Sequence, residues 1–157
     1  MKHPDFHKYF VYKKGNLYWK VKKYKMNIGD KAGSNCPGRS HVMLDQKYYK
    51  VHRVIFWMHH GYFPIIVDHI DGNNSNNKIE NLRAATHIQN SQNMKIRPNN
   101  KCGIKGVCWC PLYNKWTSQL VVDGSTKNLG YFKNIKDAER AVREARVKYH
   151  GEFARHA

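Results

Sequence analysis

Short runs in which apolar and polar residues alternate dominate the first fifty positions, and this pattern indicates β-strands rather than helices. The runs at 10–12 and 17–21 enclose the turn-forming pair Gly15-Asn16, so they predict a β-hairpin. A loop rich in Gly, Ser, Asn and Pro follows at 29–40. Residues 41–51 repeat the alternating pattern and predict a second hairpin.

The pattern then changes to helical spacing, because the apolar positions within 51–60 recur every three or four residues. Gly61 ends this predicted helix. The β-rich run at 65–70 leads into a polar turn, and 82–85 can form a short return strand. A capping box predicts that a helix begins directly after this strand, over 86–94.

The carboxy-terminal third predicts three short strands, at 106–109, 115–122 and 127–132, followed by one amphipathic helix. Asn134 can cap this helix and Gly151 can end it. The predicted fold class is therefore α+β. It comprises a small N-terminal β-sheet, a central strand–strand–helix unit and a C-terminal three-stranded antiparallel sheet packed on one helix.

Composition narrows the classes of protein that this pattern allows. The 157 residues include 28 Lys and Arg against 11 Asp and Glu, a formal charge of +17. The apolar share of 41% is too high for a disordered basic tail. No apolar run approaches the roughly 20 residues of a membrane span, and the first residues lack the apolar stretch of a signal peptide. We expect an intracellular protein without membrane contact, whose partner is a polyanion, with nucleic acid the first candidate.

The positive charge is concentrated in two flanks. Residues 1–60 hold 13 basic and 3 acidic side chains, and residues 101–157 hold 11 and 5. The centre, 61–100, is nearly neutral with 4 and 3, and it is rich in His, Asp and Asn. Electrostatic binding by the flanks, with chemistry in the centre, would produce this distribution.

Four cysteines are present, Cys36, Cys102, Cys108 and Cys110. Their spacing differs from the paired C-x-x-C units of a zinc ribbon, so it favours reduced thiols in a reducing compartment. A metal clip made by the last three cysteines and one histidine is the alternative.

The centre carries a constellation of polar residues at defined spacing: Val67-Asp68-His69-Ile70-Asp71-Gly72-Asn73, Asn76-Asn77, Asn81-Leu82-Arg83, Thr86 and Asn90. This constellation resembles the ββα-metal motif of the HNH endonucleases, and most closely that of the phage and intron homing enzymes. The resemblance extends upstream through Val51-His52-Arg53 and covers about residues 40–95 well.

Hydrolysis of a phosphodiester needs an activated water and a Lewis acid on the phosphoryl oxygens. The resemblance implies that Asp68 and Asn90 are ligands of one divalent ion, Mg²⁺ or Mn²⁺, which prefers oxygen donors. It implies that His69 is the general base, since an imidazole with a pKa near 6.5 can accept a proton at neutral pH. Asn81 is implied to hold the segment of His69 in place by hydrogen bonds. The strand is expected to bend there, because adjacent side chains otherwise point to opposite faces.

One histidine is an alternative to Asn90 as the second metal ligand. Asn90 occupies a position where many relatives have histidine, and His87, on a similar face of the predicted helix, is the rival ligand. We expect His52, His59 and His60 at the surface or in contact with phosphates.

The carboxy-terminal stretch, residues 102–154, resembles the APETALA-type (ethylene-response-factor) DNA-binding domain. The resemblance rests on Gly106-Val107, Lys115-Trp116, Leu129-Gly130-Tyr131-Phe132, the Ala138 and Ala141 helix positions, and His150-Gly151-Glu152-Phe153-Ala154. By strand alternation, the open sheet face would carry Cys108, Cys110, Thr117, Gln119, Val121 and Asn128. Because the arginines that read bases in that family are missing from this face, its sequence preference cannot be transferred.

Together these features predict a division into residues 1–50, a β-rich DNA-contacting segment; 51–95, the nuclease; 96–101, a linker; and 102–157, a DNA-binding module. The side chains expected to contact double-stranded DNA are Arg53, Arg83, Lys95, Arg97, Lys105, Lys115, Gln119 and Lys127.

The predicted function is metal-dependent cleavage of DNA, leaving 5′-phosphate and 3′-hydroxyl ends, by nicking or by double-strand cleavage. A monomer that nicks is preferred, because no long apolar seam demands a dimer. The protein is expected in the cytoplasm, that of a bacterial host if a phage encodes it. One alternative is a DNA-binding regulator with an inactive nuclease fold. Another is a nuclease that acts on RNA or on branched DNA.

Overall fold

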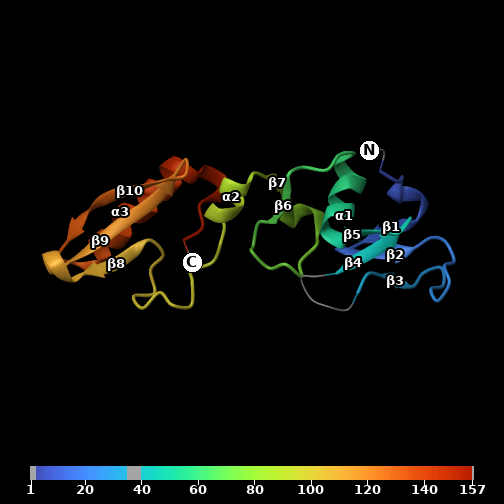
Figure 1. The fold of residues 1–157 in the computed structure, drawn as a ribbon, viewed down its shortest axis with the longest axis horizontal. Helices are drawn as coiled ribbons and strands as arrows, with labels where there is room; N and C mark the ends of the chain where they lie inside the picture. The colour runs from blue at the N-terminus through green and yellow to red at the C-terminus, as the bar shows by residue number, and fades with distance from the viewer. Residues whose placement is uncertain (1–2, 35–39, 157) are drawn as a thin grey trace. The chain divides into compact units, whose positions relative to one another are not determined.

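The computed structural model describes residues 3–34 and 40–156, so Cys36 lies outside the described part. The chain forms two compact units, Met1–Ala85 and Thr86–Ala157 (Figure 1). Small antiparallel sheets and a few helices make up both units, which confirms the predicted α+β class. Within the described residues, no helix combines the length and apolarity needed to cross a membrane.

In its described residues, 3–34 and 40–85, the first unit contains three small antiparallel sheets, one α-helix and two 3-10 turns. Its elements are η1 (Phe6–Lys8), β1 (Phe10–Lys13), β2 (Asn16–Trp19), β3 (Lys31–Ala32), β4 (His41–Leu44), β5 (Lys47–Lys50), α1 (Val51–His60), β6 (Ile66–His69), η2 (Ile79–Asn81) and β7 (Leu82–Ala85). The sheets are β1-β2-β3, β4-β5 and β6-β7.

Both predicted N-terminal hairpins are present, with one shift in a turn. Lys14 and Gly15, rather than Gly15 and Asn16, connect β1 to β2, and both have positive φ, at 45° and 83°. A two-residue hairpin loop of type I′ needs positive φ at both positions, which glycine adopts without strain. β3 was not predicted: its two residues lie in the expected loop and pair with β2.

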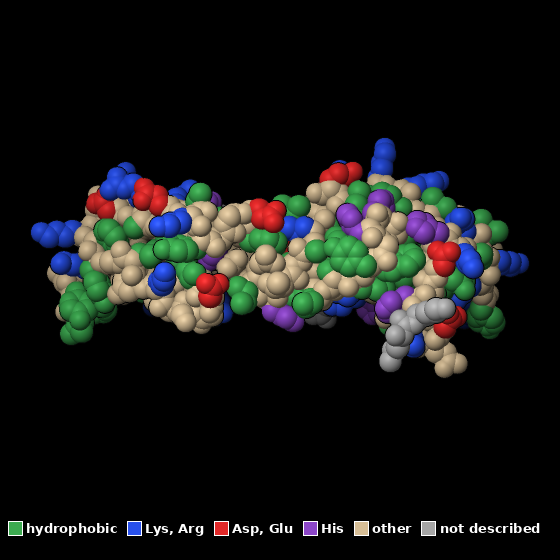
Figure 2. Space-filling view, turned by 90° about the horizontal axis from the view of Figure 1, so that it is seen from above, with side chains coloured by type: hydrophobic (Ala, Val, Ile, Leu, Met, Phe, Trp, Pro, Cys, Tyr) green, Lys and Arg blue, Asp and Glu red, His purple; other side chains and the backbone are tan. Residues whose placement is uncertain are grey.

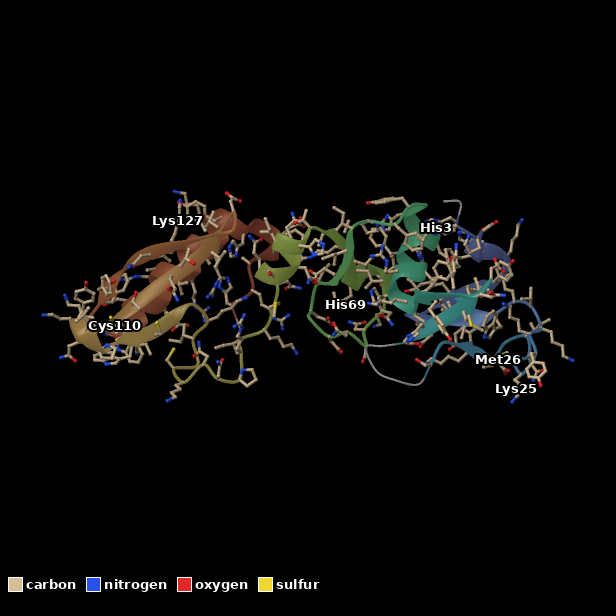
Figure 3. All side chains as sticks on the ribbon, viewed as in Figure 1. His3, Lys25, Met26, His69, Cys110 and Lys127 are labelled. Carbon is tan, nitrogen blue, oxygen red and sulfur yellow. The ribbon has the colours of Figure 1, made fainter. Side chains whose placement is uncertain are left out.

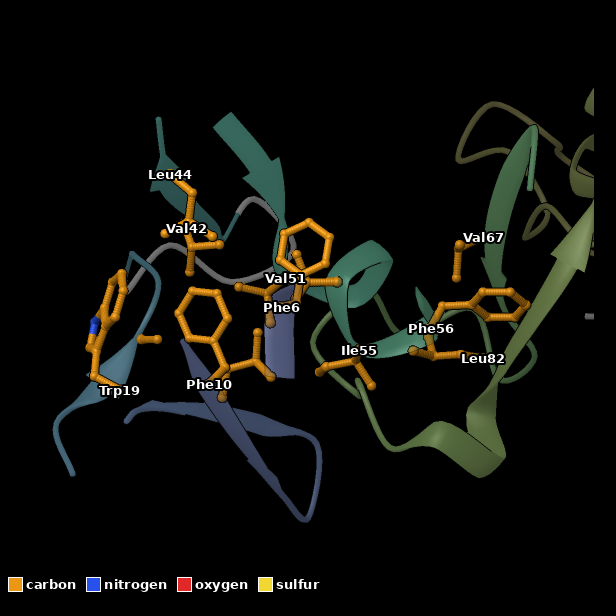
Figure 4. Packing of buried hydrophobic residues seen from close by; sticks show 13 residues of the cluster. Phe6, Phe10, Trp19, Val42, Leu44, Val51, Ile55, Phe56, Val67 and Leu82 are labelled. Atoms are coloured by element: carbon orange, nitrogen blue, oxygen red, sulfur yellow. The ribbon is translucent and has the colours of Figure 1, made fainter. Parts of the chain in front are cut away.

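Helix α1 forms over the predicted residues and ends at Gly61, which adopts the left-handed conformation with φ 78°. Its apolar face lies within one core that extends from Phe6 to Leu82 along the chain. Figure 4 shows α1 between the two hairpins and the β6-β7 pair, with Phe56 beside Val67 and Leu82. The predicted boundary at residue 50 therefore crosses a continuous hydrophobic core.

The second unit contains one three-stranded sheet with the order β10-β9-β8 and two α-helices. Its elements are α2 (His87–Gln92), β8 (Val107–Cys110), η3 (Pro111–Tyr113), β9 (Lys115–Val122), β10 (Ser125–Phe132), α3 (Ile135–His150) and η4 (Gly151–Phe153).

Helix α3 covers one face of this sheet, as the pattern predicts. Along β9, Ser118 and Leu120 are buried, whereas Gln119 and Val121 are exposed on the open face. The Ser118 hydroxyl donates a hydrogen bond of 2.6 Å to the Ala138 carbonyl of α3, which joins the helix to the sheet. The functional division predicted for residues 1–50, 51–95, 96–101 and 102–157 stays a prediction.

Candidate active site

Asp68 and His69 occupy the end of β6, opposite Arg83 and Leu82 of β7. Figure 3 labels His69 among the side chains of this unit. Val67, Asp68 and His69 are buried in succession, so both faces of the strand are covered at this point. A buried polar side chain is unstable without hydrogen-bonding partners. The partners of Asp68 and His69 therefore define the site.

Asp68 pairs with Arg83, whose Nε lies 3.0 Å from the carboxylate Oδ2. Both side chains are largely buried, with 7% and 12% exposed. In this structure Arg83 is the counter-ion of Asp68. Its predicted DNA contact stays a prediction.

His69 has two side-chain neighbours that the sequence did not indicate. Its Nε2 lies 2.9 Å from Oδ1 of Asn77, in the loop between β6 and η2. The ring of His52, from α1, meets the His69 ring edge-on at a centroid distance of 5.1 Å. His52 was expected at the surface or in contact with phosphates; it is half-buried beside His69, and a phosphate contact stays a prediction.

The loop between β6 and η2 is closed by Asn81. Its Oδ1 accepts a hydrogen bond from the Asp71 backbone N–H (3.0 Å), and its Nδ2 donates to Asp71 Oδ1 (2.9 Å) and to the Asn76 carbonyl (2.8 Å). Asn81 ends η2, directly before the return strand β7. Its contacts agree with the holding role that the motif implies.

Asp71 gathers the other hydrogen bonds of this loop. Its carboxylate accepts from the Asn73 backbone N–H (2.8 Å) and from the Asn76 amide (2.7 Å), besides the Asn81 amide. Burial opposes ionisation of Asp71, but the hydrogen bonds outweigh it and lower its pKa below the ordinary value. Because its oxygens are engaged within the loop, Asp71 is a structural carboxylate.

The N-terminal hairpin supports the same loop from outside. The Tyr12 hydroxyl accepts a hydrogen bond of 3.0 Å from the Ile79 backbone N–H. Gly15 packs so closely on the loop that a Cβ there would lie 3.0 Å from Lys78 N and 3.1 Å from the Asn77 carbonyl carbon. The hairpin predicted to contact DNA thus also shapes the site.

Arg53 has a structural role as well. Its Nη1 and Nη2 donate to the carbonyls of Ile65 and Pro64, at 3.1 and 2.9 Å, and its guanidinium lies over the Phe63 ring. It therefore fixes the segment that leads into β6. Its predicted DNA contact stays a prediction.

Asn90 belongs to α2, the first helix of the second unit. The capping box that starts α2 is present: Thr86 accepts from the Gln89 backbone N–H, and the Gln89 side chain accepts from the Thr86 backbone N–H. Asn90 is half-buried and His87 is exposed. The choice of Asn90 over His87 as the metal ligand stays a prediction. That Asn90 and Asp68 bind the same ion also stays a prediction.

The donor chemistry of these residues fits a hard divalent ion. Among the described residues, no group of three or more His, Cys, Asp and Glu side chains is placed to hold a metal. Cys102 instead donates to the Val107 carbonyl, with Sγ 3.0 Å away. The predicted ligands, the Asp68 carboxylate and the Asn90 amide oxygen, suit Mg²⁺, because Mg²⁺ retains several water ligands and needs few from the protein.

The remaining predicted DNA contacts lie in the second unit. Lys95, Arg97, Gln119 and Lys127 are exposed, and Lys115 is half-buried. Lys105 differs, because its Nζ donates to the carbonyls of Gln92 and Met94, at 2.8 and 2.6 Å. Burial, followed by the charges of Arg146 and Arg155, lowers the pKa of Lys105 to about 8. Its ammonium group is thus used to join two segments of the unit.

Basic side chains are spread over both units. The first unit has 15 Lys and Arg against 6 Asp and Glu, and the second has 13 against 5. Figure 2 shows Lys and Arg projecting at many points of one face, with fewer acidic groups between them. Such a surface attracts a polyanion along the chain rather than at one spot.

Comparisons with known proteins match the segment that builds the site. A family model described as HNH endonuclease matches residues 49–92. Protein 3.8 of Escherichia phage T7 is 34% identical over 95 residues, which are 60% of this chain and 75% of that protein. A protein of Acanthamoeba polyphaga mimivirus, named an uncharacterized HNH endonuclease, is 35% identical over 140 residues, 85% of this chain and 67% of that protein. No solved structure matches significantly.

The environment of His52 predicts a dependence of stability on pH. Burial, followed by the charges of His69, Lys50 and Arg53, lowers the pKa of His52 from 6.5 to about 3. Between these two values the unfolded chain binds a proton that the folded chain does not. The free energy of unfolding should therefore fall as pH drops from about 6.5 towards 3.

Urea unfolding at a series of pH values measures this dependence for the wild type and for His52→Phe. The variant should lose stability less steeply over the same window, because it has no imidazole to protonate on unfolding. Equal slopes for the two proteins would contradict the assignment.

Proposed function

The chain belongs to the HNH endonuclease family, and from this premise we propose that it is a metal-dependent DNA endonuclease of the homing type. The observation that supports the proposal most strongly is the pair Asp68 and His69, both buried at the end of β6 beside a loop that Asn81 closes. A carboxylate next to an imidazole provides a metal ligand and a proton acceptor at one phosphate. We propose that a monomer nicks duplex DNA in the cytoplasm of its host.

Asp68 and Asn90 would hold one Mg²⁺ or Mn²⁺ through carboxylate and amide oxygens. When bound, the ion supplies Lewis-acid polarisation of the phosphoryl oxygens. Arg83, the buried counter-ion of Asp68, keeps this carboxylate oriented towards β7 through its Nε–H. The two residues therefore act as one unit, and a change such as Asp68→Ala would remove the oxygen that accepts from Arg83 Nε–H.

His69 would act as the general base. It takes a proton from a water molecule, and the oxygen of the resulting hydroxide forms a bond to phosphorus. The bond from phosphorus to the 3′ oxygen breaks, and this oxygen takes a proton from solvent. The products are a 5′-phosphate and a 3′-hydroxyl. Asn81 supports the step without touching substrate, because its amide is spent on Asp71 and Asn76.

The second unit would contribute DNA binding through the open face of its sheet, like the APETALA-type domain that it resembles. Gln119 and Val121 are exposed there, whereas Lys127 pairs with the buried Leu120 and extends its Nζ over the Tyr149 ring of α3 at 4.6 Å. Because this face lacks the arginines that read bases in that family, we propose that the second unit contributes mostly phosphate contacts and only modest base preference.

His69→Ala should lower the rate of plasmid nicking with Mg²⁺ by about 10²–10⁴, as expected for loss of a general base. DNA affinity in a gel shift should change little, since one imidazole is a small part of the contact. His41→Ala, at an exposed position of β4 in the same unit, is the matched control and should nick normally. A His69→Ala protein that nicks like the wild type would remove His69 from the mechanism.

Asp68→Asn should abolish Mg²⁺-supported nicking while the protein stays folded, because the amide oxygen can still accept from Arg83. Asn90→Asp should keep part of the activity, since it keeps an oxygen ligand. Nicking over a Mg²⁺ titration measures both effects. If Asn90→Ala behaves like the wild type and His87→Ala is inactive, the helix ligand is His87 and not Asn90.

Replacing Lys115 and Lys127 together by Gln should weaken binding to duplex DNA and make its salt dependence shallower. Each phosphate contact contributes about −0.9 to the slope of log affinity against log salt. Gln119→Ala is the matched control, because it changes the same sheet without removing a cation, and its slope should stay that of the wild type. Unchanged affinity and slope in the double variant would reject a DNA-binding role for Lys115 and Lys127.

A further inference from the structure

The second unit contains a pocket of about 560 Å³, and the residues that line it lie within 88–150. They come from α2, from the segment that follows it, from β9 and β10, and from α3. Apolar side chains, among them Ile88, Ile96 and Leu120, form part of the wall. A pocket of this volume with a partly apolar wall is typical of a site for a small organic ligand.

Two cations line this pocket away from bulk solvent, Arg146 of α3 and Lys105 of the segment before β8. Arg146 is only 1% exposed; its Nη2 donates to the Lys105 carbonyl, and its buried Nε has no hydrogen-bond partner in the described part of the chain. Lys105 donates to the carbonyls of Gln92 and Met94, which uses two of its three N–H groups. Both side chains therefore retain hydrogen-bonding capacity for a ligand.

Negative charge does not balance these cations. None of the described residues that line the pocket is Asp or Glu, and no carboxylate among the described residues forms an ion pair with Arg146 or Lys105. Lys95 and Arg97, which are exposed, add two more positive charges to the lining. A buried charge is unfavourable unless it is paired. An anionic ligand would supply the missing partner.

The pKa shifts of two neighbouring groups reflect the same surplus of positive charge. Burial, followed by the charges of Arg146 and Arg155, lowers the pKa of Lys105 to about 8. Burial, followed first by the charge of Arg146, also lowers the pKa of His156. Both shifts disfavour a further positive charge, as expected where cations gather without an anion.

His150 of α3 provides the pocket with a hydrogen-bond acceptor. Its Nε2 lies 2.9 Å from the Val121 carbonyl oxygen, which can only accept, so Nε2 carries the proton. Its Nδ1 is buried, and none of the described residues forms a hydrogen bond with it. In a neutral ring this nitrogen accepts a hydrogen bond, which suits a hydroxyl or amino group of a ligand.

We propose that this pocket binds a nucleotide through a 5′-phosphomonoester group. Arg146 and Lys105 would contact the phosphate, because a guanidinium and an ammonium both form charge-assisted hydrogen bonds to phosphate oxygens. A phosphomonoester carries about −1.5 to −2 charge at pH 7, so it can balance two cations, whereas a carboxylate carries a single charge. His150 would accept from the sugar or the base, and the apolar wall would pack against the base.

Two sources present this group, a free nucleoside 5′-monophosphate and the 5′-phosphate end of a DNA strand. The pocket would recognise the same phosphate, sugar and base in either. The inference goes beyond the proposed function, because binding in the pocket requires neither Mg²⁺ nor cleavage.

Calorimetric titration of the full-length protein in EDTA, with deoxyadenosine 5′-monophosphate as the probe, tests the proposal. We expect saturable binding at one site per chain. Deoxyadenosine, which lacks the phosphate, should bind about 10- to 100-fold more weakly, the range expected for hydrogen bonds to a charged group.

Arg146→Met and Lys105→Met should each weaken binding of the monophosphate by about 10- to 100-fold. Arg140→Met is the matched control, because it removes a guanidinium from the same helix at an exposed position where Arg140 pairs with Asp137. Binding to this control should equal that of the wild type.

A further variant blocks the pocket and keeps both cations. Thr126→Trp adds a large side chain at an exposed position of the lining, so it should also weaken binding. Ser125→Trp, at the adjacent exposed position outside the lining, is its control. These variants, with Lys105→Met, keep the test decisive if Arg146→Met does not fold.

A trinucleotide with a 5′-phosphate, compared with the same trinucleotide with a 5′-hydroxyl, separates the two sources. A preference of about tenfold or more for the phosphorylated form assigns the pocket to DNA ends. Binding of the monophosphate without this preference assigns it to a free nucleotide, and either result supports the proposal.

The proposal is overturned if neither phosphate-bearing probe binds more tightly than its counterpart without the phosphate. Monophosphate binding that both Lys105→Met and Thr126→Trp leave unchanged would also overturn it, because the ligand would then lie elsewhere on the protein.

Discussion

The hydrogen bonds between Asn81 and Asp71 are the interaction on which the site depends. They tie the start of the nine-residue loop that separates β6 from η2 to the residue that ends η2. The buried Asn81 side chain uses both its oxygen and its nitrogen on this loop, while the Asn81 carbonyl accepts from the Ile70 N–H at 2.9 Å. A loop closed in this way brings Asn77 back to His69, across eight residues of chain.

The N-terminal hairpins and the nuclease strands share one core, and this constrains how the first unit can be divided. α1 buries residues against the hairpins and against β6-β7. A segment of about fifty residues rarely stabilises an independent core, so a common core is the expected solution. The hairpins can then serve two purposes: a basic outer surface, and a turn that fixes the loop of Asn77.

Local rules were sufficient to predict most elements. α1, the capping box of α2 and the β8-β9-β10 meander follow from apolar spacing and turn residues, because these signals act over a few residues. The place of Lys14 in the turn between β1 and β2 was not predicted, and neither was the short strand β3. Pairing with a strand more than ten residues away, as β3 does with β2, leaves no mark on a two-residue segment.

Site residues could be proposed from the sequence where the chemistry needs a rare combination of neighbouring side chains. Residues that only the folded loop brings to the site could not. Asp68 and His69 stand out as an adjacent carboxylate and imidazole. Asn77 does not stand out, because Asn73, Asn74 and Asn76 surround it in the same loop and only the folded loop distinguishes them. The arginines are also hard to interpret from the sequence, where Arg53 and Arg83 both resemble phosphate contacts. The structure adds contacts that the sequence does not show: Arg53 donates to backbone carbonyls and Arg83 to a buried carboxylate.

The central claim is that Asn81 and Asp71 act together to present His69, and a double-mutant cycle tests it most directly. Single-turnover nicking would be measured for wild type, Asn81→Ala, Asp71→Ala and the double variant, all with Mg²⁺. The account predicts strong non-additivity: either single change opens the loop, so the double variant should be scarcely slower than the slower single one. Losses that multiply would mean that the two residues act independently, and would contradict it.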